Sequence, residues 1–141
     1  MALVANVAWA CKCNWGNLEP REGYAEMIAA VDAVTLATAI EVKTDYSFGN
    51  WPDLGTKLTK FEPQRTWKGD FHHSFQTKID TNCCVCGVSF EVGQTYVLFL
   101  HGPDAEGYYS TSSCARARIR HHQSMEDEIL ILDELTGRSQ R

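Results

Sequence analysis

The chain has 141 residues and a mass of 15.8 kDa, with 44% apolar and 22% charged residues, which excludes both a disordered tail and a coiled coil. Thirteen basic residues against eighteen acidic ones give a net charge of −5, which argues against nucleic acid as a partner. No apolar run approaches the roughly 20 residues that span a bilayer, so we expect a soluble protein with one domain and no membrane span.

The first ten residues have features of a secretory signal peptide. A short apolar run ends in Ala8-Trp9-Ala10, directly before Cys11. Signal peptidase accepts only small side chains at the first and third of these positions, so the pattern predicts cleavage before Cys11 and a secreted or periplasmic protein. An intact amino-terminal arm is the alternative, because the usual cationic region is absent. The predicted organisation is a signal-peptide remnant or arm over 1–10, one domain over 11–137 and a tail over 138–141.

The first part of the domain predicts a short helix followed by a strand. Four residues recur at the intervals of one helical face: Tyr24, Met27, Ile28 and Val31. Residues 34–42 then alternate apolar with smaller or polar side chains, which predicts a strand with one buried face. Residues 45–57 contain Asp, Ser, Gly, Asn and Pro, which predict a loop.

Two more strands are predicted on either side of a tight turn at Lys68-Gly69-Asp70. Residues 58–67 form the first of them, and Pro63 requires a bulge or an edge position because proline has no N–H to donate. Residues 71–79 alternate as the next strand.

The last two strands lie on either side of a turn over 101–107. Gly93 precedes the nearly all-apolar stretch 94–100, which predicts a central strand because such strands are buried on both faces. Residues 108–111 form a short fifth strand.

A second helix is predicted near the carboxyl end. Ser124, followed three residues later by Asp127, resembles a capping arrangement, and Gly137 is suited to end the helix. Four residues share one face of it: Met125, Ile129, Leu132 and Leu135. The predicted fold is therefore mostly β, a five-stranded OB-fold barrel with a short N-terminal helix and a C-terminal helix.

The six cysteines are compatible with disulfides or with a metal site. They lie in Cys11-Lys12-Cys13, in Cys83-Cys84-Val85-Cys86 and at Cys114. A thiolate zinc site would gather Cys11, Cys13, Cys83 and Cys86, but zinc knuckles usually place two to four residues between paired cysteines. The single residue between Cys11 and Cys13 favours disulfides, and spacing alone does not choose among the fifteen possible pairings.

Six short motifs occur in order along the chain. They are Cys11-Lys12-Cys13, Val31-Asp32-Ala33-Val34, Trp67-Lys68-Gly69, Val85-Cys86-Gly87, Gly93-Gln94-Thr95-Tyr96-Val97-Leu98-Phe99 and Ser113-Cys114. Together they resemble the netrin-like domain of the tissue inhibitor of metalloproteinases (TIMP) family. The stretch from Cys114 to Arg118 is similar to secreted bacterial members, and the resemblance covers residues 11–136.

The resemblance implies an OB-type barrel whose amino-terminal segment is held by two disulfides. In that pattern Cys11 pairs with Cys86, and Cys13 pairs with Cys114, which closes loops of about 74 and 100 residues. The family pattern does not explain Cys83 and Cys84, whose Cα atoms lie about 3.8 Å apart, too close for an unstrained disulfide. Either one can link to a second molecule or replace Cys86 as the partner of Cys11.

The resemblance also implies inhibition of a zinc metalloprotease. In inhibitory members the α-amine and carbonyl oxygen of the first mature residue bind the catalytic zinc of the target, and that residue is Cys11 here. Lys12 would enter a specificity pocket of the protease, with Cys13 and Asn14 beside it in the contact. The zinc belongs to the target, so no cofactor of the protein itself is expected.

Two other functions remain open from the sequence. One is a non-inhibitory module on the same scaffold that binds an extracellular protein or a glycan. The other is an intracellular, reduced protein that binds metal through its thiols. No Ser-His-Asp order, phosphate loop or paired-carboxylate motif occurs, so we predict that the protein is not an enzyme.

Three further sets of residues have structural interpretations. The adjacent pairs His72-His73 and His121-His122 would point to opposite faces of a strand, which disfavours metal binding by either pair. Trp67 is predicted to lie in the core or at the barrel end. Three alternating arginines could form a small surface for contact with an anion, but the favoured prediction is the solvated side of an extended segment: Arg116, Arg118 and Arg120.

Overall fold

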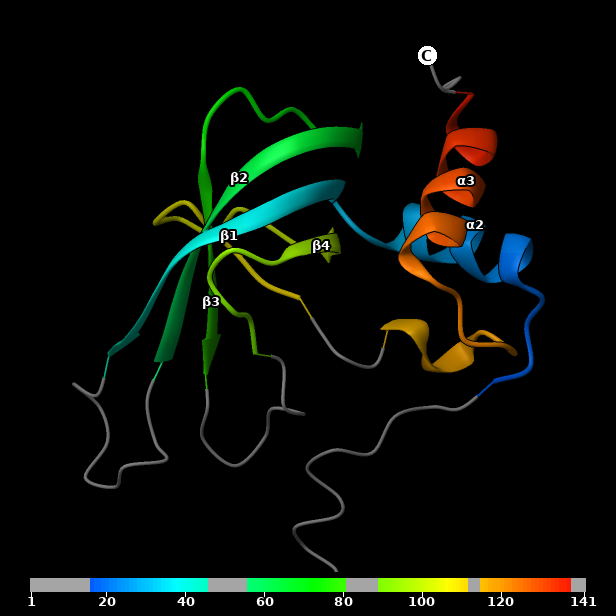
Figure 1. Cartoon of the computed structure of the whole chain (residues 1–141), viewed down its shortest axis with the longest axis horizontal. Helices are drawn as coiled ribbons and strands as arrows, with labels where there is room; N and C mark the ends of the chain where they lie inside the picture. The colour runs from blue at the N-terminus through cyan, green and yellow to red at the C-terminus, as the bar shows by residue number, and fades with distance from the viewer. Residues whose placement is uncertain (1–15, 46–55, 81–88, 112–114, 138–141) are drawn as a thin grey trace, which may run out of the picture.

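The computed structural model describes residues 16–45, 56–80, 89–111 and 115–137, and in these ranges the protein is mostly β (Figure 1). A five-stranded sheet lies on one side and the helices lie on the other. The strands are β1 (Ala33–Asp45), β2 (Thr56–Lys68), β3 (Phe75–Asp80), β4 (Thr95–Leu100) and β5 (Tyr108–Tyr109). The helices are α2 (Pro20–Ala30), the 3-10 helix η1 (Ala115–Arg118) and α3 (Met125–Thr136). None of the helices in the described ranges has the length and apolar composition of a membrane span.

The strands follow the order β4-β1-β2-β3-β5 across the sheet. Neighbouring strands are antiparallel, except that β3 and β5 are parallel. The two outer strands approach each other just beyond their ends, where His101 and Ser110 exchange two backbone hydrogen bonds of 2.9 Å. An isolated antiparallel bridge therefore joins the residue after β4 to the residue after β5.

The irregularity predicted at Pro63 is present in β2. Leu36 pairs with Arg65 whereas Ala37 pairs with Pro63, so Gln64 is the extra residue of a bulge. β3 pairs only with residues 56–61 of β2, so the proline lies beyond the part of β2 that has a partner on that side. A bulge at this point accommodates the missing N–H and bends the strand.

Two apolar clusters cover the two faces of the sheet. The cluster under the helices contains Tyr24, Met27, Val31, Val34, Trp67, Val97, Phe99 and Leu132. The cluster on the opposite face, which we call the aromatic cluster, contains Ala33, Ala37, Ala39, Phe61, Phe75, Leu98 and Leu100. The prediction that Trp67 lies in the core is confirmed.

Burial of β1 and β4 differs from the prediction. Consecutive residues Ala33, Val34 and Thr35 are all buried, so the first part of β1 is covered on both faces rather than one. β4 was predicted to be central because of its apolar run, but it is the first strand in the order. Its residues 97–100 are buried because the helices cover one face and the aromatic cluster covers the other.

The third strand begins later than predicted. β3 starts at Phe75, and residues 71–74 lie outside the sheet. Gly69, with φ +92°, turns the chain sharply after β2. The ring of Phe71 still packs against Phe75, with ring centroids 4.5 Å apart, so its burial arises from aromatic contact rather than from strand pairing.

Both predicted ends of α3 are confirmed. The Ser124 hydroxyl accepts a hydrogen bond of 3.1 Å from the Asp127 backbone N–H, and Gly137 ends the helix with φ +75°. Leu132 is fully buried, but Met125, at the start of the predicted apolar face, is 41% exposed. The helix therefore packs through its middle and end.

Candidate functional site

The residues predicted to contact a protease lie outside the described part of the chain. These are Cys11, Lys12, Cys13 and Asn14. The other cysteines, Cys83, Cys84, Cys86 and Cys114, also lie outside it, so both predicted disulfides and the metal contact of Cys11 stay predictions. The predicted segments 1–10 and 138–141 lie outside it as well.

The described residues that follow Cys13 and Cys114 lie side by side. The Leu18 N–H donates to the Arg118 carbonyl at 3.0 Å, and the Arg120 N–H donates to the Leu18 carbonyl at 2.8 Å. These bonds form a short parallel bridge between Leu18 and Ile119. A Cβ at Gly16 would lie 2.8 Å from the Arg118 carbonyl oxygen, so this close approach requires glycine.

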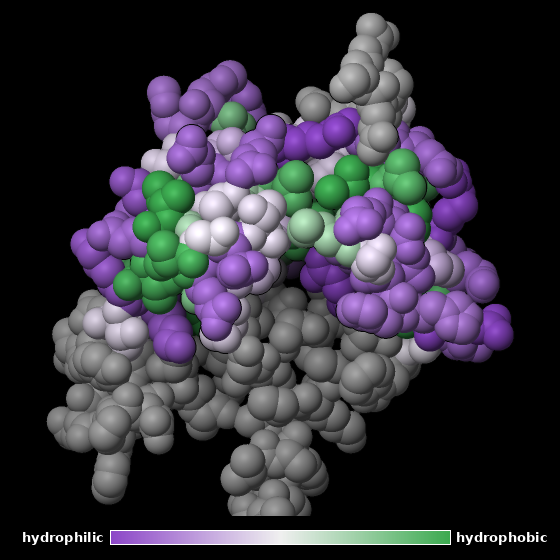
Figure 2. All heavy atoms as spheres, in the orientation of Figure 1, coloured by the Kyte–Doolittle hydropathy of each residue, from purple (hydrophilic) through white to green (hydrophobic). Residues whose placement is uncertain are grey.

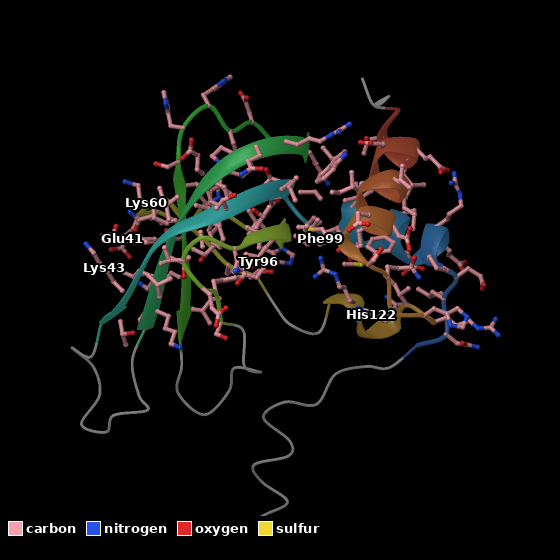
Figure 3. The ribbon with its side chains drawn as sticks, viewed as in Figure 1. Glu41, Lys43, Lys60, Tyr96, Phe99 and His122 are labelled. Carbon is pink, nitrogen blue, oxygen red and sulfur yellow. The ribbon has the colours of Figure 1, made fainter. Side chains whose placement is uncertain are left out.

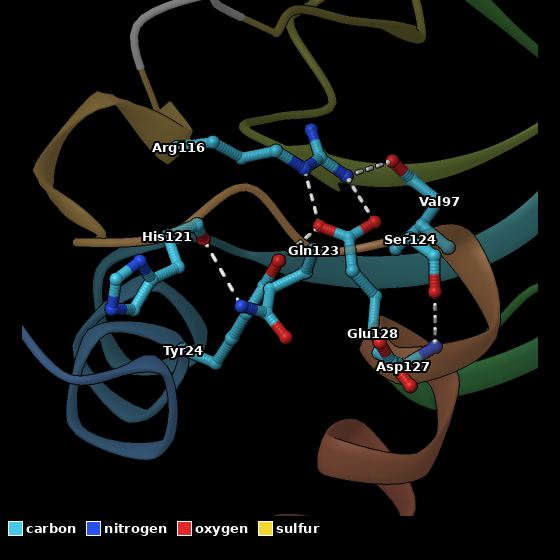
Figure 4. Close-up of polar contacts among 8 residues, drawn as sticks. All are labelled: Tyr24, Val97, Arg116, His121, Gln123, Ser124, Asp127 and Glu128. Atoms are coloured by element: carbon cyan, nitrogen blue, oxygen red, sulfur yellow. Dashed lines mark hydrogen bonds and ion pairs between the residues drawn. The ribbon is translucent and has the colours of Figure 1, made fainter.

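A buried polar network joins α2, η1, α3 and β4 next to this bridge (Figure 4). Arg116 donates to both carboxylate oxygens of Glu128, with Nη2 to Oε1 at 3.1 Å. The same Nη2 donates to the Val97 carbonyl at 2.9 Å, and the Tyr24 hydroxyl donates to Glu128 Oε2. The guanidinium also lies 5.2 Å from the centre of the Phe99 ring. Both carboxylate oxygens of Glu128 therefore have hydrogen-bond partners. A carboxylate needs such partners when its residue is only 5% exposed, because burying an unpaired charge is costly.

A second buried carboxylate fixes α3 to the sheet. Asp133 Oδ1 accepts a hydrogen bond of 2.8 Å from the Trp67 indole and lies 2.7 Å from Arg65 Nη2. Together, Glu128 and Asp133 hold the start and end of α3 by charge-assisted contacts.

The three arginines near the bridge correct a prediction. All three arginines are exposed, as predicted, but residues 115–118 form a 3-10 turn rather than an extended segment. Each arginine faces a carboxylate from a distant element: Arg116 faces Glu128, Arg118 lies 3.0 Å from Glu26, and Arg120 lies 3.6 Å from Glu19. The surface here is therefore a set of ion pairs and not a free cationic stripe.

The network changes the acidity of its members. Burial raises the pKa of Tyr24 above its ordinary value, and the neighbouring Glu128 raises it further. Burial lowers the pKa of Arg116, but hydrogen bonds and attraction to Glu128 outweigh that effect, so the net shift is upward. Tyr24 stays protonated and Arg116 stays charged over the usual pH range.

Tyr24 is expected to make the protein sensitive to alkali. Because its pKa is higher in the folded state, the folded chain keeps a proton that the unfolded chain loses above about pH 10. Stability should be unaffected below that pH and should fall as pH rises further, by up to about 1.4 kcal/mol per pH unit. Urea unfolding from pH 8 to 11 measures this slope.

The variant Tyr24→Phe should flatten that slope, at a cost of about 1 kcal/mol at neutral pH for the lost hydrogen bond. Tyr108→Phe is the matched control, because the Tyr108 ring lies against Lys78, at 5.6 Å, and outside this network. An unchanged slope in Tyr24→Phe would assign the alkaline loss to other groups.

One feature of the α3 sequence indicates the buried network, namely the position of Glu128. Glu128 follows Met125 by three residues and precedes Leu132 by four, so it falls on the predicted apolar face. An acid at such a position needs a buried partner. No local pattern identifies Tyr24 or Arg116 as that partner, because they lie 104 and 12 positions from Glu128 in the chain.

Metal ligands do not gather in the described ranges. No group of three or more His, Cys, Asp or Glu side chains among these residues could hold a metal ion. His72 lies 2.9 Å from Asp70 in an exposed pair, and His121 and His122 are exposed in the segment that links η1 to α3.

The described surface facing the viewer is hydrophilic over most of its area, with hydrophobic residues gathered over the strands and where the sheet meets the helices (Figure 2).

Comparison with known proteins identified no matching family model and no matching curated protein.

Proposed function

We propose that the protein is a secreted, TIMP-like inhibitor of a zinc metalloendopeptidase, built on a netrin-like domain. The motifs that carry the resemblance supply the expected cysteine pattern. The observation that supports it best is the parallel bridge between Leu18 and Ile119. This bridge brings the chain that follows the proposed inhibitory segment against the chain that follows Cys114.

The finer fold that we propose is an OB-type barrel. The order β4-β1-β2-β3-β5, with β3 and β5 parallel, is the order obtained when an OB barrel is opened between its fourth and fifth strands. The hydrogen bonds between His101 and Ser110 support closure, because they join the two strands at the ends of that order.

The bridge also supports the proposed pairing of Cys13 with Cys114. Each cysteine precedes its member of the bridged pair by five residues, and the two described segments run in the same direction. A crosslink there would hold the amino-terminal segment against η1. The second proposed disulfide, between Cys11 and Cys86, rests on the resemblance alone.

The proposed chemistry requires a free amine at Cys11. Catalytic zinc keeps an open position that water normally occupies, and the amine nitrogen and carbonyl oxygen of the first residue can replace that water. An α-amine has a reference pKa near 7.7–8.0, so a useful fraction is unprotonated at neutral pH. Disulfides that hold the segment rigid lower the ordering cost of binding.

The charge of Lys12 limits which proteases could be the target. Inhibitory animal members usually carry a small hydroxyl residue at this position, whereas Lys12 is a long cation. Burying its ammonium in an apolar pocket is costly unless a carboxylate lies inside. The proposed target therefore has an acidic specificity pocket, with Cys13 and Asn14 contacting its rim.

The test compares the protein that begins at Cys11 with a form that carries one added alanine before it. Against a panel of zinc endopeptidases, the added residue should weaken inhibition at least about 100-fold, because it converts the chelating amine into an amide. A form with one added alanine at the carboxyl end is the control and should inhibit normally.

Two results would contradict the proposal. Equal inhibition by both amino-terminal forms would exclude chelation through Cys11. A lack of inhibition across the panel would favour the non-inhibitory protein- or glycan-binding module on the same scaffold.

A further inference from the structure

The strand β1 runs past the end of β4 and has an uncovered outer edge there (Figure 1). On one side β1 pairs with β2 over residues 34–45. On the other side it pairs with β4 only over residues 33–38, and the Ala39 carbonyl then accepts a hydrogen bond of 2.7 Å from the Gly93 N–H. Beyond that point no described residue pairs with the backbone of β1 on this side. We call residues 41–45 the open edge of β1.

The open edge has the regular geometry that strand pairing requires. Ile40, between Ala39 and Glu41, is the extra residue of a bulge in the pairing with β2. After this bulge, residues 41–45 pair with β2 one to one. A regular strand at the edge of a sheet presents a row of N–H and C=O groups that can pair with another extended chain.

The charges of the open edge alternate around Val42. Glu41 precedes it and Lys43 follows it, and their side chains are 49% and 67% exposed. Within one chain, Lys43 Nζ lies 3.6 Å from Glu41 Oε2, which is a weak contact between exposed groups. Figure 3 shows both residues, together with Lys60, on the side of the molecule away from the helices. Both charges are therefore available to a second chain.

This charge pattern is self-complementary for two antiparallel copies of the strand. Opposite residues in an antiparallel pair point their backbone groups the same way relative to the joint, so the two-fold axis of two identical strands passes through a residue. An axis at Val42 places Glu41 opposite Lys43 of the second copy, and symmetry repeats this pair. An axis one position earlier places Glu41 opposite its own copy, and an axis one position later does the same for Lys43. Only the register centred on Val42 pairs opposite charges, and like charges directly opposite are destabilising.

Two exposed apolar side chains lie next to the open edge. Ile40 is 41% exposed, and Val92, which directly precedes Gly93, is 61% exposed. In the register centred on Val42, Ile40 lies close to Thr44 of the second copy. Strand pairing would therefore also remove apolar area from water at both ends of the joint.

We propose that the open edge of β1 joins two copies of this chain in an antiparallel strand pair centred on Val42. Lys60 of β2 pairs with Glu41 across the sheet, so Lys60, Glu41 and Lys43 of the second copy form a row of alternating charge. A joint of about five residues on each side is small, so the dimer is weak and reversible. This inference does not rest on the proposed inhibitory function, because residues 11–14 take no part.

The test measures self-association of the full chain by sedimentation equilibrium, at concentrations from about 10 µM to about 1 mM. The wild type should show a monomer–dimer equilibrium. Glu41→Lys and Lys43→Glu should each weaken dimerisation at least about tenfold, because each turns two opposite-charge pairs into like-charge pairs. The double variant that combines both substitutions should dimerise as the wild type does, since the exchange preserves each pair.

Mixing the two single variants is the matched control. Glu41→Lys places lysine on both sides of Val42, and Lys43→Glu places glutamate on both sides, so the two variants complement each other. The mixture should dimerise although neither variant does so alone, and this result would also show that both variants are folded. Lys60→Glu controls for net charge, because Lys60 lies on β2 and not on the edge (Figure 3), and it should dimerise within about threefold of the wild type.

Backbone NMR signals locate the joint, because those of residues 41–44 should shift as the concentration rises. Shifts confined to other residues would contradict the proposal. It is also overturned if the wild type stays monomeric at every concentration, or if the mixture associates no better than the single variants. Equal weakening by Lys60→Glu and Lys43→Glu would assign the effect to net charge and would overturn it as well.

Discussion

Replacing Glu128 with glutamine is expected to lower the free energy of unfolding by about 2–3 kcal/mol. The carboxylate is buried and receives hydrogen bonds from Tyr24 and Arg116, so the change leaves a guanidinium without its counter-charge. The cost should be below the roughly 3–5 kcal/mol of a fully buried pair, because the Arg116 side chain is 41% exposed and keeps some contact with water. Chemical denaturation at pH 7 measures it.

The control is the neighbouring pair at the surface. Glu134 on α3 pairs with Arg21 on α2, and both side chains are more than half exposed. Glu134→Gln should therefore cost about 0.5 kcal/mol or less. If both glutamine variants unfold at the same denaturant concentration, the network at Glu128 does not hold α3 in place.

Removing the proposed Cys13–Cys114 disulfide, by changing both residues to serine, is expected to cost about 2–4 kcal/mol. A loop of about 100 residues is worth up to about 4.7 kcal/mol in the chain-entropy model, and measured values are usually smaller. The bridge between Leu18 and Ile119 should lose order with it, since its two segments are then joined without a covalent link, by backbone hydrogen bonds and exposed ion pairs. Denaturant unfolding without reductant measures the loss.

The two single variants test whether Cys13 and Cys114 are bonded to each other. Because one bond is removed in every case, Cys13→Ser, Cys114→Ser and the double variant should lose nearly the same free energy. Additive losses would mean that the two cysteines have different partners. Intact mass before and after reduction and thiol alkylation counts the remaining disulfides independently.

Much of the secondary structure was predictable because its causes are local. The helix over 20–30 follows from apolar residues spaced for one helical face. The bulge near Pro63 follows from the missing N–H of one residue. The strand boundaries were less predictable, as β3 shows, since pairing ends where a partner strand ends and not where alternation ends.

The candidate site was predictable only in part. The arginines after Cys114 were recognised as a group, but their partners come from α2 and α3. Tyr24 and Glu128 are separated by 104 positions in the sequence, and no local pattern reports that contact.

The sequence by itself determined which stretches are helices, strands and turns, and where α3 begins and ends, because capping, turn chemistry and hydrophobic period act over a few residues. Ser124 and Gly137 at the two ends of α3 are the clearest case. Only the tertiary structure decided that β4 is an outer strand with two covered faces, and that Glu128 and Asp133 are buried with distant cationic and aromatic partners. Burial and pairing of charge depend on which surfaces meet in three dimensions, and that is a property of the whole chain.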